Sequence, residues 1–521
     1  MITITVDTEV LFIIHTLQKA GFEAYIVGGA VRDILLAVDD DSISVTDFDF
    51  TTNAKPKEIL ELFADSFYEN TFGTVSITRE HVREHMPVAL SLALHDDNLS
   101  STNNKLIDIE SASKIHESLA DATHQHKAPE YQTKALYEIT TFRSDGAYTN
   151  NRHPETVTWG ESLKEDVDRR DFTINALALE IDQAFCTSIL EKKETSEYTQ
   201  VPAEAYTLID YHEGITDLKN GLIRTVGNPN KRFMEDALRI LRAIRFSVQL
   251  NMQIEDETYA AIETHAKLLQ NISWERIRDE FLKMLASNYP REAIEILDAC
   301  GCLEYLLPEL LLGKGVEQGG HHTTDVWEHS LAALETCPSK DPIVRLATLI
   351  HDIGKPDTFK RINGQPTFYN HEVVGAHMAK SICRRLKLSK EETERIFILV
   401  RNHMFYYQPE NTDASIRRFM RKVGLNNIDD ILDLREGDRL GSGAKKTSWR
   451  LEEMKQRMVE QLHQPFAIKD LAINGHDLMN ELGLKPGPRL GEILQQLFEE
   501  VLEDPELNTR EALLEKAKEL A

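Results

Sequence analysis

The chain has 521 residues, 41% of them hydrophobic and 28% charged, which predicts an ordinary globular protein with several domains. Its formal net charge of −27 argues against a general nucleic-acid binder, so a polyanionic partner would have to be held by a local basic surface. Five irregularly spaced cysteines, no apolar run of about 18 residues and an N-terminus without a basic signal segment lead us to expect a cytoplasmic protein with no membrane contact.

The first part of the chain alternates short strands and helices, which predicts an α/β fold over residues 1–180. The expected elements are a strand over 24–27, a helix over 31–36, a strand over 47–51, a helix from Pro56 to Phe63, and strands over 74–78 and 136–142. Two polar stretches, at about 80–133 and 191–205, lack a sustained hydrophobic period. We interpret both as insertions.

Two aspartates, Asp47 and Asp49, flank Phe48 in the third of these predicted elements. Residues i and i+2 of a strand face the same side, so both carboxylates are expected to hold divalent metal ions together while Phe48 enters the core. Gly28 and Gly29 end the preceding strand, where exposed backbone amides can bind phosphate oxygens. This combination predicts a magnesium-dependent phosphoryl-transfer site. The alternative is a polar strand end, since such triplets are common by chance.

Another carboxylate, Glu138, lies in the strand predicted over 136–142. It is a candidate third acidic group beside the metals, and a solvent-facing strand position is the alternative.

From Phe233 onward the hydrophobic pattern becomes helical, with apolar residues at 237, 240, 241, 244 and 248. Asp236 and Arg239 lie three residues apart and are expected to share one face of a helix. A carboxylate accepts hydrogen bonds from an exocyclic amine and a guanidinium donates to ring acceptors, so the pair can read the edge of cytosine or adenine. A plain intrahelical salt bridge is the competing interpretation.

A histidine-rich helical block follows a glycine-rich linker at 312–320 and extends to about residue 443, before a last helical segment that begins near Phe466. Imidazole and carboxylate ligands together suit Mn, Fe, Ni, Co or Zn. We prefer His371 to His377 as a ligand. His321 and His322 are assigned to the linker, with a metal contact by one of them as the alternative. The candidate metal ligands are His329, His351, Asp352, His371, His403 and Asp438. A scaffold that retains these residues without a metal is the alternative.

Five segments of the first 290 residues, taken in order, resemble motifs A to E of the class II tRNA nucleotidyltransferases, which belong to the polymerase-beta-like superfamily. The segments are 28–33 with 47–49, 169–177, 227–233, 235–239 and 273–277.

The resemblance implies a role for each matching residue. Asp47 and Asp49 would hold Mg²⁺, with Glu138 as a further catalytic candidate, and Asp236 and Arg239 would select the base. Glu235 is expected to brace Arg239 or a neighbouring residue. The remaining residues assigned to nucleotide binding are Gly28, Gly29, Arg32, Asp33, Arg170, Asp171, Asn175 and Arg242.

Other segments resemble further parts of the same enzymes. Residues 351–355 resemble the signature of the HD metal-dependent phosphohydrolases, which implies hydrolysis of phosphoesters such as cyclic 2′,3′-phosphate or phosphomonoester ends of RNA.

Residues 146–154 resemble the flexible loop associated with the switch to A addition, and the segment from 466 resembles the tRNA-elbow-binding tail. A helical dimerisation module is the alternative for the tail.

We therefore predict a multidomain protein with an α/β polymerase-beta-like head and all-α neck, HD and tail domains. The predicted bounds are 1–180, 181–311, 320–443 and 450–521. The predicted activity is template-independent addition of CCA to tRNA from CTP and ATP. The alternatives are an enzyme that adds only A, a poly(A) polymerase, and an HD phosphohydrolase whose head only binds RNA.

Overall fold

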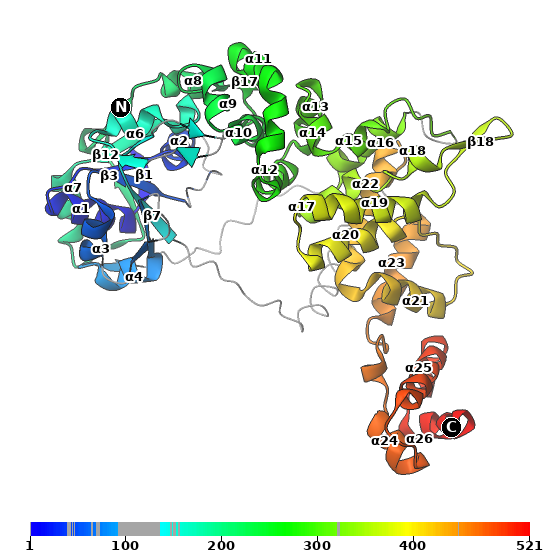
Figure 1. The fold of residues 1–521 in the computed structure, drawn as a ribbon. Coiled ribbons are helices and arrows are strands. Elements are labelled where there is room, and N and C mark those ends of the chain that lie inside the picture. Colours follow the sequence, from blue (N-terminus) through cyan, green and yellow to red (C-terminus); the bar gives the residue numbers. More distant parts are fainter. Residues whose placement is uncertain are drawn as a thin grey trace, which may run out of the picture. The chain divides into compact units, whose positions relative to one another are not determined.

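The computed structural model describes residues 2–38, 43, 45, 47–63, 66–68, 73–91, 136–145, 148–149, 153–154, 157–319, 324–445 and 448–521. These residues form two compact units, and the chain passes from the first to the second between Leu307 and Pro308 (Figure 1). The first unit contains the predicted head and neck, and the second contains the histidine-rich helices and the tail. The finer division into head, neck, HD domain and tail stays a prediction. Within the described residues, no helix is both long and apolar enough to cross a membrane.

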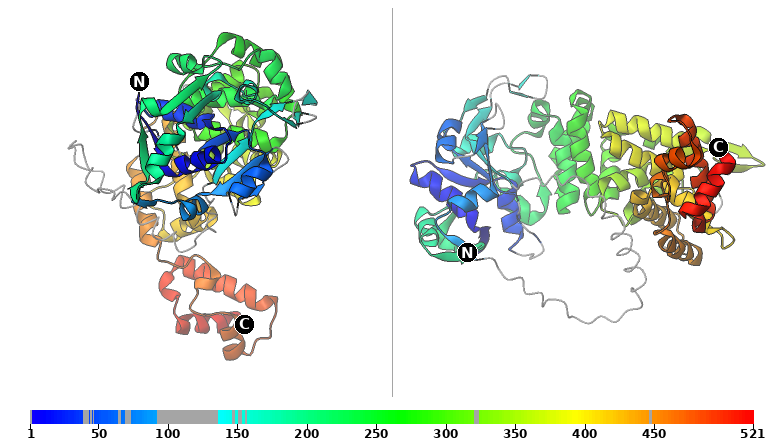
Figure 2. Two further views of the ribbon diagram at one scale, coloured as in Figure 1. Left: turned by 90° about the vertical axis from the view of Figure 1, so that its left-hand side faces the viewer. Right: turned by 90° about the horizontal axis from the view of Figure 1, so that it is seen from below.

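A mixed seven-stranded sheet organises the first unit, in the order β15-β12-β2-β3-β7-β5-β4 (Figures 1 and 2). Only β3 and β7 run parallel; the other neighbours are antiparallel. Its strands are β2 (Ala24–Val27), β3 (Asp49–Thr52), β4 (Phe67–Tyr68), β5 (Thr74–Thr78), β7 (Leu136–Thr141), β12 (Leu177–Ile181) and β15 (Tyr206–Asp210). The predictions over 24–27 and 74–78 are confirmed, whereas the strand predicted from Asp47 begins at Asp49.

Strand β2 is buried on both faces because its side chains alternate between two cores. Ala24 and Ile26 pack into the larger core, while Tyr25 and Val27 pack into a smaller one on the other face of the sheet. Two buried faces explain why this strand reads as a continuous apolar run. The helices that cover the sheet are α1 (Thr8–Lys19), α2 (Gly29–Leu36), α3 (Pro56–Leu62), α6 (Leu163–Asp168) and α7 (Gln183–Leu190).

The second predicted insertion is wrong, because residues 191–205 belong to the head. Strand β14 (Tyr198–Val201) pairs antiparallel with the N-terminal strand β1 (Ile4–Asp7), and the Thr8 and Thr199 hydroxyls are 2.7 Å apart. Of the first insertion, α4 (Arg79–His85) and β6 (Ala89–Ser91) are described, and residues 92–135 lie outside the described part. The remaining short strands of this unit are β8 (Arg143–Asp145), β9 (Tyr148–Thr149), β10 (His153–Pro154), β11 (Val157–Trp159), β13 (Glu194–Ser196), β16 (Leu222–Ile223) and β17 (Gln253–Ile254).

Helices follow the sheet, as the hydrophobic period predicts. Helix α9 begins at Pro229, a favoured first-turn position, under an Asn228 cap whose side chain accepts from the Lys231 amide. The helices are α8 (Gly214–Asn220), α9 (Pro229–Glu235), α10 (Leu238–Leu250), α11 (Asp256–His265), α12 (Trp274–Ala286), α13 (Pro290–Ala299) and α14 (Leu303–Leu306).

The second unit is helical apart from a hairpin of β18 (Lys360–Ile362) and β19 (Gln365–Thr367) in its described residues. Residues 466–521 build a core of their own around Phe498. The helices are α15 (Pro308–Leu311), α16 (Val326–Thr336), α17 (Pro342–Leu349), α18 (Lys355–Thr358), α19 (His371–Arg385), α20 (Lys390–Asn402), α21 (Asp413–Val423), α22 (Ile428–Gly441), α23 (Trp449–Gln461), α24 (Gly475–Leu482), α25 (Pro488–Glu503) and α26 (Arg510–Leu520).

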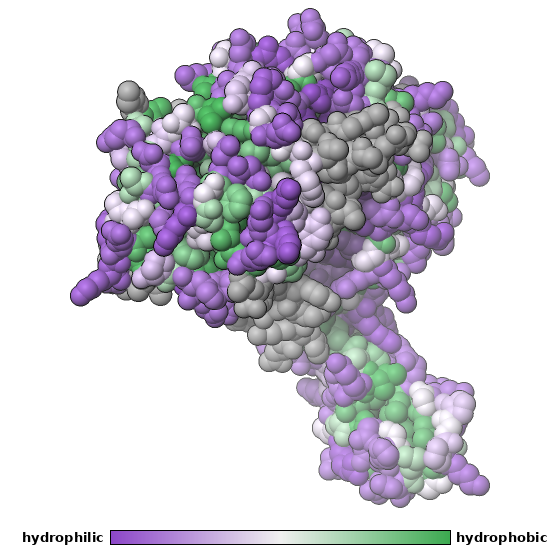
Figure 3. Space-filling model, turned by 60° about the vertical axis from the view of Figure 1, so that its left-hand side comes forward, coloured by the Kyte–Doolittle hydropathy of each residue, from purple (hydrophilic) through white to green (hydrophobic). Residues whose placement is uncertain are grey.

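The glycine-rich stretch at 312–319 is not a free linker. Gln318 is buried, donates to the Asp325 carbonyl at 3.0 Å and accepts from Lys355 Nζ at 2.6 Å. The stretch is thus packed against the histidine-rich helices. On the face drawn in Figure 3, hydrophilic side chains predominate between smaller apolar areas, as the high charged fraction leads one to expect.

Candidate active sites

The turn between β2 and α2 brings Asp49 and Arg170 to one place. Gly28 has φ of 76°, a left-handed conformation that favours glycine. A Cβ on Gly28 would lie 2.8 Å from Arg170 Nη1 and 3.7 Å from Asp49 Oδ2. Only glycine therefore fits at this position, next to a carboxylate and a guanidinium from distant parts of the chain.

The predicted acidic residues gather at this end of the sheet. Asp49 pairs with Val27 on one side and with Glu138 on the other, and neighbouring strands are about 4.8 Å apart. Phe48 is buried, while Asp47 and Glu138 are exposed and Asp49 is partly buried. The pKa of Asp49 is raised above its ordinary value, because burial and the charge of Asp47 outweigh the lowering effect of Arg170. Clustered carboxylate oxygens of this kind are the ligands that Mg²⁺ prefers.

Several of the residues predicted to bind the nucleotide form a hydrogen-bonded chain. Arg32 Nη1 donates to Asn175 Oδ1 at 2.7 Å, and Asn175 Nδ2 donates to Asp171 Oδ1 at 3.4 Å. Asp171 Oδ2 accepts from Arg242 Nε at 2.6 Å. Asp33 also belongs to this group, since it accepts from Arg32 Nε at 2.8 Å. Burial raises the pKa of Asp171, but Arg242 and Arg239 hold it below its usual value.

Three guanidiniums of this region surround one aromatic ring. Arg32 and Arg242 each lie 5.3 Å from the centroid of Phe246, and Arg245 lies 4.1 Å from it. Cations over a ring face are attracted by its quadrupole, so Phe246 helps to hold like charges close together. Its role was not predicted, because nothing local in the sequence marks it.

Arg170 is anchored by a residue that the sequence reasoning missed. Asp166, in the first turn of α6, accepts from Arg170 Nη2 at 3.3 Å and from Arg169 Nε at 3.0 Å. Burial raises the pKa of Asp166, but the two arginines lower it below its ordinary value. The spacing of three and four residues is a signal that could have identified this contact.

The predicted shared helix face of Asp236 and Arg239 is wrong. Helix α9 ends at Glu235, and Asp236 is its extended C-cap residue, with φ −144° and ψ 105°. Arg239 belongs to the next helix, α10. The two side chains also have separate partners, so the intrahelical salt bridge is wrong as well.

Each residue of this pair is held from a different direction. Asp236 accepts from Arg276 Nη2 at 2.7 Å and Nη1 at 3.3 Å. Arg239 donates to Glu235 at 2.7 Å and to the Arg169 carbonyl at 3.1 Å, which confirms the contact expected of Glu235. Arg276, on α12, was not among the predicted site residues, although it lies in the segment that resembles motif E.

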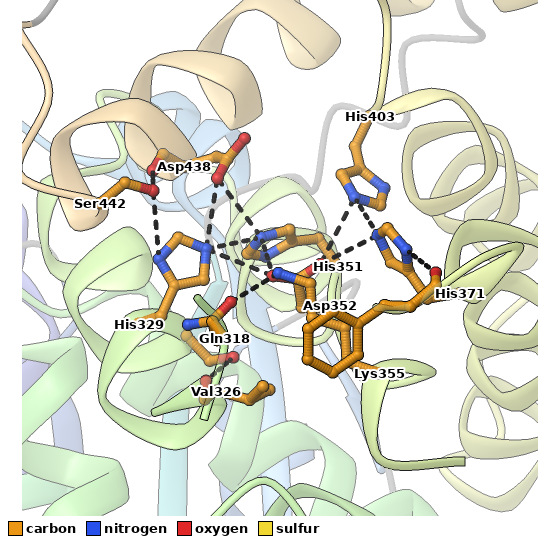
Figure 4. Close-up of polar contacts among 12 residues, drawn as sticks. Gln318, Val326, His329, His351, Asp352, Lys355, His371, His403, Asp438 and Ser442 are labelled. Carbon is orange, nitrogen blue, oxygen red and sulfur yellow. Dashed lines mark hydrogen bonds and ion pairs between the residues drawn. The ribbon is translucent and has the colours of Figure 1, made fainter. Parts of the chain in front are cut away.

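In the second unit, the six predicted metal ligands converge (Figure 4). They come from α16, the segment after α17, the start of α19, the end of α20, and α22. One ligand atom each from His329, His351 and Asp438 lies within 4.8 Å of the others, as do those from His351, Asp352 and His403. His371 Nε2 is 3.3 Å from His403 Nε2, and His377 instead contacts Phe397. His321 and His322 lie outside the described residues.

Asp352 is central to this cluster. Its Oδ2 is 3.3 Å from His329 Nε2 and 3.2 Å from His351 Nε2. Its Oδ1 faces the other pair, 3.3 Å from His371 and 3.5 Å from His403. The carboxylate therefore lies between two histidine pairs, with which it would hold a divalent metal.

The outer hydrogen bonds orient the imidazoles. The Nδ1 atoms of His351, His371 and His403 lie 2.7–2.8 Å from the carbonyls of Thr348, Phe368 and Val400. Such contacts leave Nε2 directed into the cluster, as is typical of histidine metal ligands. Burial lowers the pKa of His351, but Asp352 and Asp438 raise it to about 10. The buried histidine and carboxylate set fits a divalent transition metal.

A cavity of about 550 Å³ opens beside the cluster. Its basic lining residues are Lys355, Arg435 and Arg439. Lys355 Nζ is 2.5 Å from Asp352 Oδ2, and Arg435 Nη1 is 2.6 Å from Asp438 Oδ2. The sequence reasoning did not single out these cations, although Lys355 ends the segment that resembles the HD signature. Metal ligands beside cations suit a phosphate ester.

Three family models match the chain. One described as "Poly A polymerase head domain" matches residues 24–105 and 100–224, and one described as "Probable RNA and SrmB- binding site of polymerase A" matches 251–312. A third, described as "tRNA nucleotidyltransferase domain 2 putative", matches 370–517.

Relatives named for two activities are similar over much of the chain. An A-adding tRNA nucleotidyltransferase of Deinococcus radiodurans is 35% identical, over 65% of this chain and 75% of the relative. The CCA-adding enzyme of Levilactobacillus brevis is 30% identical over 96% of this chain and 95% of the relative. That of Ligilactobacillus salivarius is 29% identical over 98% and 96%.

A solved structure shows the same fold. The crystal structure of the Bacillus stearothermophilus CCA-adding enzyme in complex with CTP superposes with a TM-score of 0.62 at 24% identity, covering 98% of this chain and 97% of that chain. The two CCA-adding relatives cover a similar share of the chain at 29–30% identity. The chain therefore belongs to the family of bacterial-type CCA-adding tRNA nucleotidyltransferases.

Proposed function

We propose that this enzyme adds C, C and A to the 3′ end of tRNA, using CTP and ATP. The tRNA 3′-hydroxyl attacks the α-phosphorus, one P–O bond forms, and the bond to pyrophosphate breaks. The observation that carries the proposal is the arrangement around Asp49. Glu138 pairs with it on the neighbouring strand, the Gly28 turn lies beside it, and the charge of Arg170 acts on its carboxylate. When bound, Mg²⁺ neutralises phosphate charge and favours the attacking alkoxide.

The chain's own residues bind and orient the substrates in this reaction. Asp47 and Asp49 would hold Mg²⁺. The Gly29 amide would face the triphosphate, since the Gly28 amide already donates to the Leu177 carbonyl at 3.2 Å. Arg32, Asn175 and Asp171 form the connected group expected to hold ribose and phosphates. Asp236 and Arg239 would contact the base. Because Arg276 holds Asp236 and Glu235 holds Arg239, the acceptor and the donor are not paired with each other.

Addition of A alone is the second candidate, because one relative is named an A-adding enzyme. In the test, the enzyme is incubated with CTP, ATP or both and with tRNA transcripts that end at the discriminator base or in CC. The products are then resolved at single-nucleotide length. We expect the bare end to gain C, C and A and then stop. One A on the CC end alone would establish the A-adding candidate, and an unlimited A ladder would establish a poly(A) polymerase.

Replacement of Arg276 should loosen nucleotide selection. Arg276→Met removes the two hydrogen bonds that hold the Asp236 carboxylate, and hydrogen bonds to charged groups make about a 10- to 100-fold difference. We expect the kcat/KM preference for CTP and ATP over UTP and GTP to fall by that factor, with partial recovery in Arg276→Lys. Arg278→Met, on the same helix, is the control. Unchanged selectivity in Arg276→Met would contradict this role.

For the histidine cluster we propose a metal-dependent phosphohydrolase that acts on phosphate groups at RNA ends. Net addition of water would open a cyclic 2′,3′-phosphate or release inorganic phosphate from a monoester. His329, His351, Asp352, His371, His403 and Asp438 would hold the metal, which supplies a Lewis acid when bound. Lys355 and Arg435 would bind the phosphate oxygens.

A further inference from the structure

A second pocket adjoins the cavity of the histidine cluster. It has a volume of about 280 Å³ and shares Arg435 and Arg439 with the 550 Å³ cavity. Its charged lining residues are Arg435, Arg439 and Arg450, and among the described residues no acidic side chain lines it. In a chain with a net charge of −27, three guanidiniums without a lining carboxylate make this pocket a local site for an anion.

Arg439 is unusual among these arginines. Arg435 is paired with Asp438 and lies 5.6 Å from the Phe405 ring centroid. In the part of the chain that the structure describes, the guanidinium of Arg439 has no hydrogen-bond or ion-pair partner, and its Nε is buried. A buried donor without a partner costs free energy, which a bound phosphate or base would recover.

Large aromatic side chains stand exposed along the two pockets. Tyr369, which lines the first, is 73% exposed, and Tyr406 and Trp449, which line the second, are 70% and 62% exposed. Exposed rings beside arginines form the usual platform on which unpaired bases stack. A protein partner would be expected to meet a larger continuous apolar patch.

We propose that the second pocket, defined by Tyr406, Arg439 and Trp449, binds the nucleotides that precede the end of a single-stranded RNA. This rests on the proposed phosphohydrolase, because the terminal phosphate would then lie at the metal cluster. Tyr406 and Trp449 stack on bases, and Arg439 contacts the connecting phosphate. The substrate class is thus an unpaired RNA 3′ end rather than a free mononucleotide, since paired bases cannot reach the rings.

The first experiment measures the binding of a short labelled single-stranded RNA by fluorescence anisotropy, using the full chain without added metal. Tyr406→Ala, Trp449→Ala and Arg439→Ala should each weaken binding about 5- to 50-fold, as base stacking and phosphate contacts predict. The matched controls are Tyr198→Ala and Arg384→Ala, which alter exposed residues outside both pockets. A hairpin duplex of the same composition should bind equally to wild type and variants.

The second experiment compares kcat/KM for a cyclic 2′,3′-mononucleotide with that for an oligonucleotide bearing the same terminal phosphate. Tyr406→Ala and Trp449→Ala should lose activity on the oligonucleotide and keep it on the mononucleotide. Arg439→Ala is tested by binding alone, because its side chain lines both cavities. If the wild type hydrolyses neither with Mn²⁺, Ni²⁺ or Co²⁺, the phosphohydrolase proposal fails while the anisotropy result still decides on RNA binding. The pocket proposal is overturned if the wild type does not bind the single strand, if the variants bind like the controls, or if both substrates lose activity equally.

Discussion

Replacement of Asp47 or Asp49 by alanine is expected to abolish nucleotide addition. The two carboxylates and Glu138 meet at one end of the sheet, and loss of metal-based charge stabilisation costs several kcal/mol. Because each 1.4 kcal/mol is a factor of ten, we expect addition to fall by about a thousandfold or more. The measurement is single-turnover extension of a tRNA transcript by CTP and ATP.

The controls for this prediction come from the same sheet. Glu180→Gln alters an exposed carboxylate on β12 and should leave addition unchanged. Glu138→Gln tests the third carboxylate. It should reduce addition less than Asp49→Ala does if Glu138 only supplements Asp47 and Asp49 in holding the metals. Wild-type addition by a folded Asp47→Ala protein would refute the assignment of this site and would favour the alternative in which the head only binds RNA.

Local patterns were sufficient where the chemistry lies in short segments. The strand over 24–27 and the alternation of Asp47, Phe48 and Asp49 follow from side-chain periodicity alone. His329, His351 and Asp438 were grouped because imidazoles and carboxylates suit a transition metal and because residues 351–355 resemble the HD signature. Helical periodicity alone could not bring them together, since they lie in three separate segments of the chain.

Long-range contacts explain what the sequence did not reveal. Helical spacing predicted one continuous helix through Asp236, but the chain breaks there, where Arg276 pairs with Asp236 from 40 residues away. Strand β14 was read as an insertion because its partner, β1, lies at the other end of the head. The roles of Arg439 and Gln318 could not be predicted, because they depend on a pocket and on hydrogen-bond partners that form only when the chain folds.

The two proposed activities should be separable, because their residues lie in different compact units. Asp352→Ala removes the carboxylate that faces both histidine pairs, so we expect loss of bound transition metal and of any phosphoesterase activity. Nucleotide addition should stay within about twofold of wild type, since sites without shared partners act independently. Metal content is measured by elemental analysis of the purified protein, alongside both activity assays.

The matched control is Asp357→Ala, which alters an exposed aspartate on α18, five residues from Asp352. It should keep metal, hydrolysis and addition. Metal in the wild type and in Asp357→Ala but not in Asp352→Ala would show that Asp352 holds the metal. A wild-type protein without metal would instead identify the cluster as a retained scaffold. Loss of addition in a folded Asp352→Ala protein would contradict independent sites and would require the histidine cluster to act on the same tRNA end as the head. In that outcome, hydrolysis at the cluster would be a step that prepares the 3′-hydroxyl for the addition reaction.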